Sequence, residues 1–357
     1  MAAEWANDSR RRMKPKVTSF DIAFRAGVSQ ATVSRALRGS PLVSAETRQR
    51  VQAVAKELNY KVDKNASSLR RQRASTLALL LFEDPTSDDS LINPFFLSML
   101  ASITRACARQ GHDLLVSFQQ MSDDWHADYQ DSHRADGVIL LGYGDYLAYR
   151  SKLERLVEEG THFVRWGSAV EDQHGASIGC DNRQGGAIAA RHLLGLGRRR
   201  IAYVGTATLQ CPEFMDRYLG YTDALAEAGL KPDPALRVDA SDSTEEVGHR
   251  AMATLLARGV AFDAVFTASD LLAIGAMRAL ADAGRRVPGD VSVVGFDDIP
   301  MAGFANPALT TVAQDTRLAG ERLVACVIDQ IRGEPVDSQR LPTQLVIRRS
   351  CGAAPRP

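Results

Sequence analysis

The sequence lacks most of the motifs that mark enzymes, metalloproteins and membrane proteins. It has no Walker A loop, no HExxH pair and no GxSxG elbow, and its seven histidines are dispersed, so no catalytic set, metal or cofactor is predicted. The five cysteines are odd in number and never stand at CxxC spacing, which indicates reduced thiols without a disulfide framework. No apolar run approaches the length of a membrane span, and the first twenty residues lack the apolar core of a signal peptide. We therefore expect a cytoplasmic protein that is not an enzyme.

A net charge of zero hides an uneven distribution of charge along the chain. Residues 1–75 hold 16 Lys and Arg against 6 Asp and Glu, whereas residues 76–357 hold 27 against 37. A basic segment attached to an acidic body is the charge pattern expected of a nucleic-acid-binding domain. Within this segment, the basic run from Arg10 to Lys16 is either a disordered, solubilising tail or an arm that contacts phosphates.

Residues 17–60 predict three short helices, each beginning after a residue that can cap it: Thr18, Ser29 and Ser44. Asp21 completes a capping-box-like pair with Thr18, and Gly27 ends the first helix. The second helix is predicted from about Gln30 to Arg38, and the third carries one apolar stripe of Val51, Val54, Ala55 and Leu58. Helix, glycine-containing turn and helix is the helix-turn-helix arrangement, whose second helix enters the major groove of DNA.

The second predicted helix carries short or hydrogen-bonding side chains on its outer side, namely Gln30, Ala31, Ser34 and Arg35. A glutamine suits a bidentate contact to adenine and an arginine a bidentate contact to guanine, each worth about 1 to 3 kcal/mol of base discrimination. This side of the helix is therefore predicted to read DNA bases. The alternative is a small helical subdomain with a solvated polar face.

The run GVSQATVSRALRGSPLVSAETRQRVQAVAKELNY resembles the headpiece of the LacI/GalR family of bacterial transcription regulators. That headpiece has a GVSxxTVSRxL helix, a VSxxTR helix and a Leu-Gly-Tyr ending, in which this chain has Asn59 for the glycine. The resemblance implies that the following residues contact operator DNA: Thr18, Ser29, Gln30, Ala31, Thr32, Ser34 and Arg35.

The run NASSLRRQ, residues 65–72, resembles the hinge helix that follows the headpiece in this family. The resemblance places Leu69 where the family has a leucine that wedges into the minor groove, with Asn65 and Ser68 as further DNA contacts. The alternative for Leu69 is an ordinary packed leucine. Lys64 stands where the family usually has proline, which should loosen the start of the hinge. Helices shorter than about 12 residues are marginal alone in water, so we expect this one to form only when two copies pack together on DNA.

Beyond residue 75, apolar strand-like runs alternate with helical patterns. The predicted strands are Leu77–Phe82, Asp113–Phe118, Gly137–Leu141, Phe163–Trp166, Ile201–Gly205, Asp263–Ala268 and Val291–Phe296, and the clearest helices are about Phe95–Arg109 and Tyr146–Glu159. Continuous apolar strands separated by helices favour parallel sheets buried on both faces. We therefore predict an α/β fold of two doubly wound lobes, with a ligand cleft at the carboxyl ends of their strands.

This part of the chain resembles the sugar-binding core of the same family, which is similar to periplasmic binding proteins. The matching runs are NPFF, DN, HLLGLGRRRIAYVG, RYLGYTDALAEAG, SDLLAIGAMRAL, VSVVGFDD and PALTTVAQD. The implied domains are a basic arm (1–16), a helix-turn-helix headpiece (17–62), a hinge and linker (63–75), a two-lobed effector-binding and dimerisation core (76–350) and a tail (351–357). The tail holds no leucine heptads, so a homodimer is expected and not a tetramer.

Two residues of the predicted cleft match the ligand-binding arginine and acid of the family: Arg217 in RYLGY and Asp297 after the VSVVGF run. A guanidinium donates and a carboxylate accepts, so the pair suits the hydroxyls of a polyol. The alternative for Arg217 is a salt bridge that closes the two lobes. Asp297 and Asp298 are adjacent in sequence, and we interpret them as acceptors for sugar hydroxyls in preference to a catalytic pair of carboxylates.

Three other residues are carried over to the effector site. Phe96 and Trp166 match aromatic residues that border ligands in the family. Such residues suit a sugar because an aromatic ring can cover the apolar face of a pyranose. The alternative for Phe96 is an ordinary core residue. Ser269 is expected first to cap the helix from Asp270 to Ala281 and only second to contact a ligand.

Arg165 is the main departure from the family, which commonly has Asp at this position. The substitution predicts a more cationic pocket and adds Arg165 to the candidate effector-binding residues. A neutral oligosaccharide, such as an α-glucoside, is the first candidate effector, and an acidic or phosphorylated sugar is its rival.

Together these features predict a repressor of carbohydrate-utilisation genes whose affinity for double-stranded operator DNA changes when a sugar-like effector closes the cleft. Two other classes remain as alternatives. A non-regulatory sugar-binding protein would need a signal sequence and no headpiece. A sugar-modifying enzyme would need a catalytic set that the sequence does not contain.

Overall fold

The computed structural model describes residues 17–37, 39–60, 74–82, 92–142, 146–168, 174–240 and 242–353. The chain divides into two compact units, residues 1–72 and residues 73–357. Each unit has a hydrophobic core of its own.

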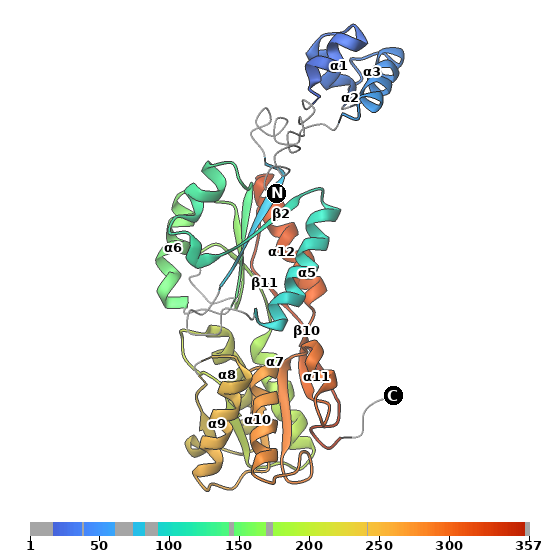
Figure 1. Ribbon diagram of the computed structural model, residues 1–357. Coiled ribbons are helices and arrows are strands. Elements are labelled where there is room, and N and C mark those ends of the chain that lie inside the picture. Colours follow the sequence, from blue (N-terminus) through green and yellow to red (C-terminus); the bar gives the residue numbers. More distant parts are fainter. Residues whose placement is uncertain are drawn as a thin grey trace, which may run out of the picture. The chain divides into compact units, whose positions relative to one another are not determined.

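The first unit is a three-helix headpiece of α1 (Ser19–Ala26), α2 (Gln30–Leu37) and α3 (Ala45–Glu57) (Figure 1). Its core is formed by one buried face from each helix, including Ile22, Val33 and Val51, all fully buried. The predicted helices and their order are confirmed, with α2 ending at Leu37 before Arg38, which lies outside the described residues.

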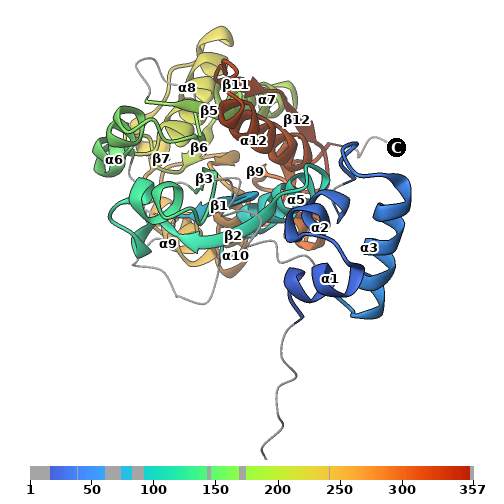
Figure 2. The ribbon, with the colours of Figure 1, turned by 90° about the horizontal axis from the view of Figure 1, so that it is seen from above.

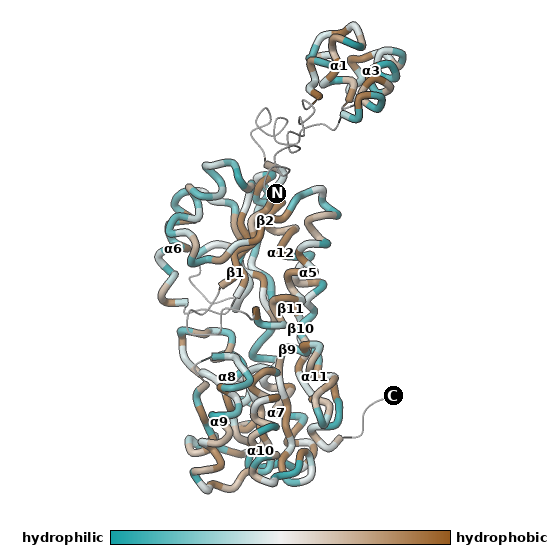
Figure 3. The backbone as a smooth tube through the Cα atoms, viewed as in Figure 1, coloured by the Kyte–Doolittle hydropathy of each residue, from teal (hydrophilic) through white to brown (hydrophobic). Residues whose placement is uncertain are grey.

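The second unit consists of two α/β lobes, and the chain passes between them three times. It leaves lobe 1 after Cys180, returns after Gln314 and leaves again after Leu341. Strand β1 (Thr76–Leu81) appears brown, and so hydrophobic, in Figure 3, which agrees with the burial of Leu77 to Leu81. Because the chain crosses between the lobes at these three places, the three crossovers border the cleft between the lobes.

Lobe 1 is a six-stranded parallel sheet in the order β11-β5-β4-β3-β1-β2. Leu77, Leu79 and Leu81 of β1 pack with α5 and α12, which lie side by side (Figure 2), whereas Ala78 and Leu80 pack with α6 on the opposite face. This alternation follows from the two-residue period of a strand. The elements are β1 (Thr76–Leu81), α5 (Pro94–Arg109), β2 (Asp113–Phe118), η1 (Gln119–Met121), a short π-helix η2 (His126–Asp131), β3 (Gly137–Leu141), α6 (Tyr146–Glu158), β4 (Phe163–Trp166), β5 (Ala176–Cys180), α12 (Thr316–Ile331) and β11 (Gln339–Leu341).

Lobe 2 is a six-stranded sheet in the order β12-β10-β9-β8-β6-β7. Helices α7 and α8 pack so closely that a Cβ at Gly186 would lie 2.0 Å from the carbonyl oxygen of Arg217, so only glycine fits there. The elements are α7 (Asn182–Gly195), β6 (Ile201–Val204), α8 (Pro212–Glu227), η3 (Pro234–Leu236), β7 (Arg237–Val238), α9 (Glu245–Ala257), β8 (Ala264–Thr267), α10 (Asp270–Asp282), β9 (Ser292–Asp297), α11 (Pro300–Phe304), β10 (Thr310–Gln314) and β12 (Thr343–Val346).

Two details differ from the prediction of parallel strands buried on both faces. Among the described residues β2 is an edge strand that pairs only with β1, and Val116 is 44% exposed despite the apolar character of its run. Strand β12 pairs antiparallel with β10, because the chain enters lobe 2 from the third crossover. The strands β5, β7, β10, β11 and β12 have no counterpart among the predicted strands, since their short runs carry little periodicity.

None of the described helices is long and apolar enough to cross a membrane. None of the five cysteines, all of which lie in the described part of the chain, forms a disulfide bond. Among the described residues, no group of three or more His, Cys, Asp or Glu side chains is arranged to hold a metal ion.

Candidate functional site

The start of α1 is fixed by the pair of Thr18 and Asp21. The carboxylate of Asp21 accepts hydrogen bonds from the backbone N–H and from the hydroxyl of Thr18, both at 2.7 Å. These bonds, the backbone bond first, lower the pKa of Asp21 below its usual value. Gly27 ends α1 in the left-handed conformation with φ of 63°, which glycine adopts without strain. The predicted capping box and helix end are confirmed.

The predicted recognition helix α2 begins next to α1. The Ser29 hydroxyl caps the start of the helix by accepting a hydrogen bond of 3.2 Å from the N–H of Thr32. The side-chain amide of Gln30 donates to the hydroxyl of Ser19 in α1 at 2.9 Å. An amide nitrogen has two hydrogens, so one hydrogen and the carbonyl oxygen of Gln30 remain for a base contact.

The outer side of α2 carries the other candidate DNA contacts. Ala31 and Arg35 are exposed and Ser34 is half-buried, whereas Val33 and Ala36 face the headpiece core. The polar face predicted from the sequence is therefore available for binding. The remaining candidates, Asn65, Ser68 and Leu69, lie outside the described residues, as does the basic run from Arg10 to Lys16.

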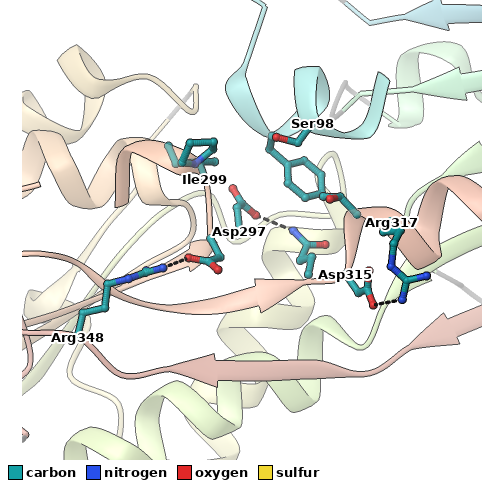
Figure 4. Close-up of a pocket in the computed structure, with 11 residues that line it drawn as sticks. Ser98, Asp297, Ile299, Asp315, Arg317 and Arg348 are labelled. Carbon is teal, nitrogen blue, oxygen red and sulfur yellow. Dashed lines mark hydrogen bonds and ion pairs between the residues drawn. The ribbon is translucent and has the colours of Figure 1, made fainter. Parts of the chain in front are cut away.

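In the second unit, a cavity of about 370 Å³ lies between the lobes (Figure 4). Lobe 1 contributes the first turns of α5 and α12, lobe 2 contributes the loop after β9, and the crossover at Gln314 and Asp315 forms part of the wall. The lining residues are Phe95, Ser98, Asp297, Asp298, Ile299, Pro300, Gln314, Asp315, Thr316, Arg317 and Arg348. The cavity thus offers carboxylates, an amide, hydroxyls, guanidinium groups and one aromatic ring.

Asp297, at the end of β9, is the candidate effector residue that lines this cavity. Its Oδ1 accepts a hydrogen bond of 2.6 Å from Gln314 Nε2 and lies 3.4 Å from Nη1 of Arg217. Burial raises the pKa of Asp297 to about 6, although Arg217 and the Gln314 bond act in the opposite direction. Its φ of 112° lies outside the regions that side-chain-bearing residues prefer, and such strain persists where the surroundings hold it.

Arg217 lies behind Asp297 and is fully buried. Its Nε donates to Oδ1 of Asn182 at 2.8 Å, its Nη1 donates to the carbonyl of Ala268, and its guanidinium group stacks 3.8 Å from the ring centre of Phe296. These partners and Asp297 all belong to lobe 2. The alternative of a salt bridge that closes the lobes is therefore wrong for the Arg217–Asp297 pair, which is internal to one lobe. Arg217 itself is not among the cavity-lining residues.

Arg165 and Trp166, at the end of β4, are both only 4% exposed and are not among the cavity-lining residues. Arg165 Nη2 donates to the carbonyl of Ser168 at 2.9 Å, and its guanidinium group lies 5.2 Å from the ring centre of Tyr146. The ring of Trp166 lies 6.0 Å from that of Phe95, which does line the cavity.

The last two candidates are also buried. Phe96 is 6% exposed and packs edge-on against Phe95 at 5.3 Å between ring centres. Ser269 is 1% exposed and caps α10, accepting a hydrogen bond of 3.3 Å from the N–H of Leu272, so the predicted cap is confirmed. Its hydroxyl also accepts from Ser243 at 2.6 Å.

Sequence reasoning missed the residues that complete the cavity. Gln314 stands in the run PALTTVAQD, which resembles the family but carries no local pattern that indicates a binding site. Arg348 donates to Asp298 at 2.6 Å, and nothing in the local sequence signals this pairing. The fully buried Asp270 accepts the N–H of Ile299 at 2.9 Å and so fixes the loop that borders the cavity. Burial, followed by the charge of Asp297, raises the pKa of Asp270 well above its usual value.

Comparisons with known proteins agree with this architecture. Residues 20–63 match the model of the bacterial regulatory proteins of the lacI family, and residues 190–351 match the periplasmic binding protein-like domain. The HTH-type transcriptional regulator CelR of Thermobifida fusca is 34% identical over 351 residues, which cover 95% of this chain and 99% of CelR.

Solved structures give the same result. The transcriptional regulator CelR–cellobiose complex aligns with a TM-score of 0.68 and 33% identity, over 94% of this chain and 99% of that one. The lac repressor dimer bound to operator and the anti-inducer ONPF aligns with a TM-score of 0.79 and 28% identity, over 94% of this chain and 98% of that one. The chain therefore belongs to the LacI family of bacterial regulatory proteins and is a transcriptional regulator with a helix-turn-helix headpiece and a periplasmic-binding-protein-like core.

Proposed function

We propose that this regulator is a repressor of carbohydrate-utilisation genes, and that a small sugar-like effector bound between its two lobes controls its affinity for operator DNA. The observation that carries the proposal is the cavity between the lobes, where the acceptor Asp297 lies against the crossover residue Gln314. Effectors that bind at a crossover favour one orientation of the lobes over another, as a ligand-controlled switch requires.

The chemistry of the cavity supports a polyhydroxylated ligand. Asp297, Asp298 and Asp315 accept hydrogen bonds, Arg317 and Arg348 donate them, and Phe95 provides an apolar ring face. The relative CelR has been solved as a complex with cellobiose, which is a ligand of this kind. Phe96, Arg165, Trp166, Arg217 and Ser269 remain part of the proposed effector site, although none of them is among the residues that line the cavity.

A neutral oligosaccharide is the proposed effector class, and an acidic or phosphorylated sugar is the rival. Three carboxylates line the cavity against two guanidinium groups, and Arg348 already pairs with Asp298 at 2.6 Å. Arg165, whose charge suggested an anionic ligand, donates to Ser168 and is not among the lining residues. An anionic ligand that bound Arg348 would therefore compete with Asp298 for the guanidinium group.

The headpiece is the proposed DNA-binding part, with the major groove read from α2. The proposed contacts are Thr18, Ser29, Gln30, Ala31, Thr32, Ser34 and Arg35 in the headpiece, and Asn65, Ser68 and Leu69 in the hinge. Because linkage is reciprocal, DNA weakens or strengthens effector binding by the same factor as the effector changes DNA binding. We further propose a homodimer, a cytoplasmic location, and no catalytic activity toward the sugar.

DNase I footprinting on the DNA upstream of the protein's own gene tests this proposal. The purified protein should protect a site with two-fold symmetry, and one member of a panel of neutral and anionic sugars should change that protection. The proposal is wrong if no site is protected at any salt concentration, or if no sugar changes the protection. Turnover of any sugar during the incubation would instead favour the enzyme alternative.

A further inference from the structure

The two lobes also meet at Ser168, two residues beyond the end of β4. The Ser168 N–H donates to Oε1 of Glu213 at 2.8 Å, and the Ser168 hydroxyl donates to the carboxylate of Asp216. Ser168 belongs to lobe 1, whereas Glu213 and Asp216 lie in the first two turns of α8 in lobe 2. Ser168 and Glu213 are 4% and 7% exposed, so this contact between the lobes excludes most water.

Arg165 supports the same contact from within lobe 1. Its Nη2 donates to the carbonyl of Ser168 at 2.9 Å. A Cβ at Gly167 would lie 2.7 Å from Oε1 of Glu213 and 2.8 Å from Nη1 of Arg165, so the opposite charges flank this glycine. The guanidinium group therefore holds Ser168 in place and lies close to the carboxylate that Ser168 engages.

A second hydrogen bond joins the lobes nearby. The N–H of Tyr146, the first residue of α6, donates to the carbonyl of Gln210 at 2.9 Å, just before α8 begins. In Figure 1, α6 and α8 lie on one side of the cleft, and α5 and α11 lie on the other. The contact is thus on the side away from the cavity wall formed by α5 and the loop before α11.

We infer that Ser168, Glu213 and Asp216 form a lobe-closing contact that sets the balance between the closed and the open cleft, with Arg165 as its positioning residue. Three crossovers allow the lobes to rotate as rigid bodies, so the free energy of closure depends on the bonds made between them. Hydrogen bonds to ionised carboxylates are stronger than those between neutral groups. The fraction of molecules with a closed cleft is therefore set before a ligand binds. For a ligand that binds only the closed form, the apparent affinity is proportional to this fraction.

The Tyr146 amide offers a test that needs neither effector nor DNA. Its hydrogen bond crosses the lobes and involves none of Ser168, Glu213 and Asp216, so its hydrogen exchange reports on opening in variants of these three residues. Arg165 lies 5.2 Å from the ring centre of Tyr146, so an Arg165 variant can also act on this amide directly. The expected result is that Glu213→Ala and Ser168→Ala each raise the exchange rate of this amide about tenfold in the full-length protein, the factor that corresponds to about 1.4 kcal/mol. Arg165→Gln should raise it by a smaller factor. Glu213→Gln retains an acceptor oxygen but loses the negative charge, so it should raise the exchange rate by less than Glu213→Ala does.

Two controls separate opening from loss of stability. Asp223→Ala removes a carboxylate of the same helix that pairs with Arg183 within lobe 2, at 2.7 Å, and should leave the Tyr146 amide unchanged. The N–H of Gly205, bonded to Val238 inside lobe 2, should exchange at the wild-type rate in every variant. If exchange at Gly205 rises in Glu213→Ala, that variant has lost stability, and the inference is then tested with Ser168→Ala, which removes only one hydroxyl. Wild-type exchange at Tyr146 in a stable Ser168→Ala or Glu213→Ala variant would overturn the inference.

Discussion

Gln314 and Asp297 are joined by a hydrogen bond of 2.6 Å from the amide nitrogen to the carboxylate. Gln314 ends β10 just before the chain crosses into lobe 1, whereas Asp297 ends β9 and stays in lobe 2. A ligand that donates to Asp297 competes with the bond that positions this crossover. The proposed ligand site and one of the three crossovers between the lobes are therefore coupled by a single side-chain contact.

We predict that Asp297→Ala lowers the free energy of unfolding, because it leaves the buried Arg217 without its carboxylate, but yields a protein that still folds and binds operator and no longer responds to effector. The substitution removes an acceptor from the cavity, and each ligand group left without a partner costs about 1 to 3 kcal/mol. Operator binding measured against effector concentration tests this, with Asp223→Ala, an exposed carboxylate of α8, as the control. A wild-type response in the Asp297 variant would mean that the effector is held elsewhere.

Arg217→Ala should act mainly on stability. The arginine is fully buried and pairs with Asp297 and Asn182, so its loss leaves a buried carboxylate without its cation. Removing one partner of such a pair lowers the free energy of unfolding by about 3 to 5 kcal/mol. Urea denaturation should show this loss, whereas Arg183→Ala, which breaks an exposed ion pair, should cost less than about 1 kcal/mol. Equal losses in the two variants would contradict the prediction.

The sequence predicts the headpiece better than the cavity, because the headpiece depends on local signals. Thr18, Ser44 and Gly27 mark helix ends within a few residues, and the structure confirms each of them. The cavity instead brings together Ser98, Gln314 and Arg348, which are far apart in the chain and share no local pattern. Sequence placed Arg165 correctly at the end of a strand, but the carboxylate beside it, Glu213, is supplied by the other lobe.

Arg35→Ala should relax base preference at one position in each half-site by about 1 to 3 kcal/mol, because the exposed arginine can make a bidentate contact to guanine. Removing the basic run from Arg10 to Lys16 should instead reduce the salt dependence of binding evenly on all sequences. Binding to operator variants over a range of salt concentrations distinguishes the two effects. Altered base preference after removal of the arm would show that the assignment is wrong.

Leu69→Ala is expected to weaken operator binding and reduce DNA bending while leaving effector binding intact, since a wedge in the minor groove acts only on DNA. A gel assay with circularly permuted operator fragments measures the bend, and calorimetry with the effector provides the control. An unchanged bend would count against a wedge at this position and favour an ordinary packed leucine.

The buried carboxylate of Asp297 should also make stability depend on pH. Burial raises its pKa from 3.8 in the unfolded chain to about 6 in the folded protein, and Arg217 and the hydrogen bond from Gln314 act in the opposite direction. A raised carboxyl pKa favours folding at low pH, and this stabilisation is lost as pH rises through about 6.

The total change in the free energy of unfolding is at most about 3 kcal/mol, because each pKa unit corresponds to about 1.36 kcal/mol. Asp297→Asn should therefore gain stability relative to the wild type between pH 4.5 and pH 8, whereas Asp290→Asn, whose half-buried carboxyl has a pKa of about 2, should not. Parallel stability curves for wild type and Asp297→Asn would show that Asp297 keeps an ordinary pKa in the folded protein.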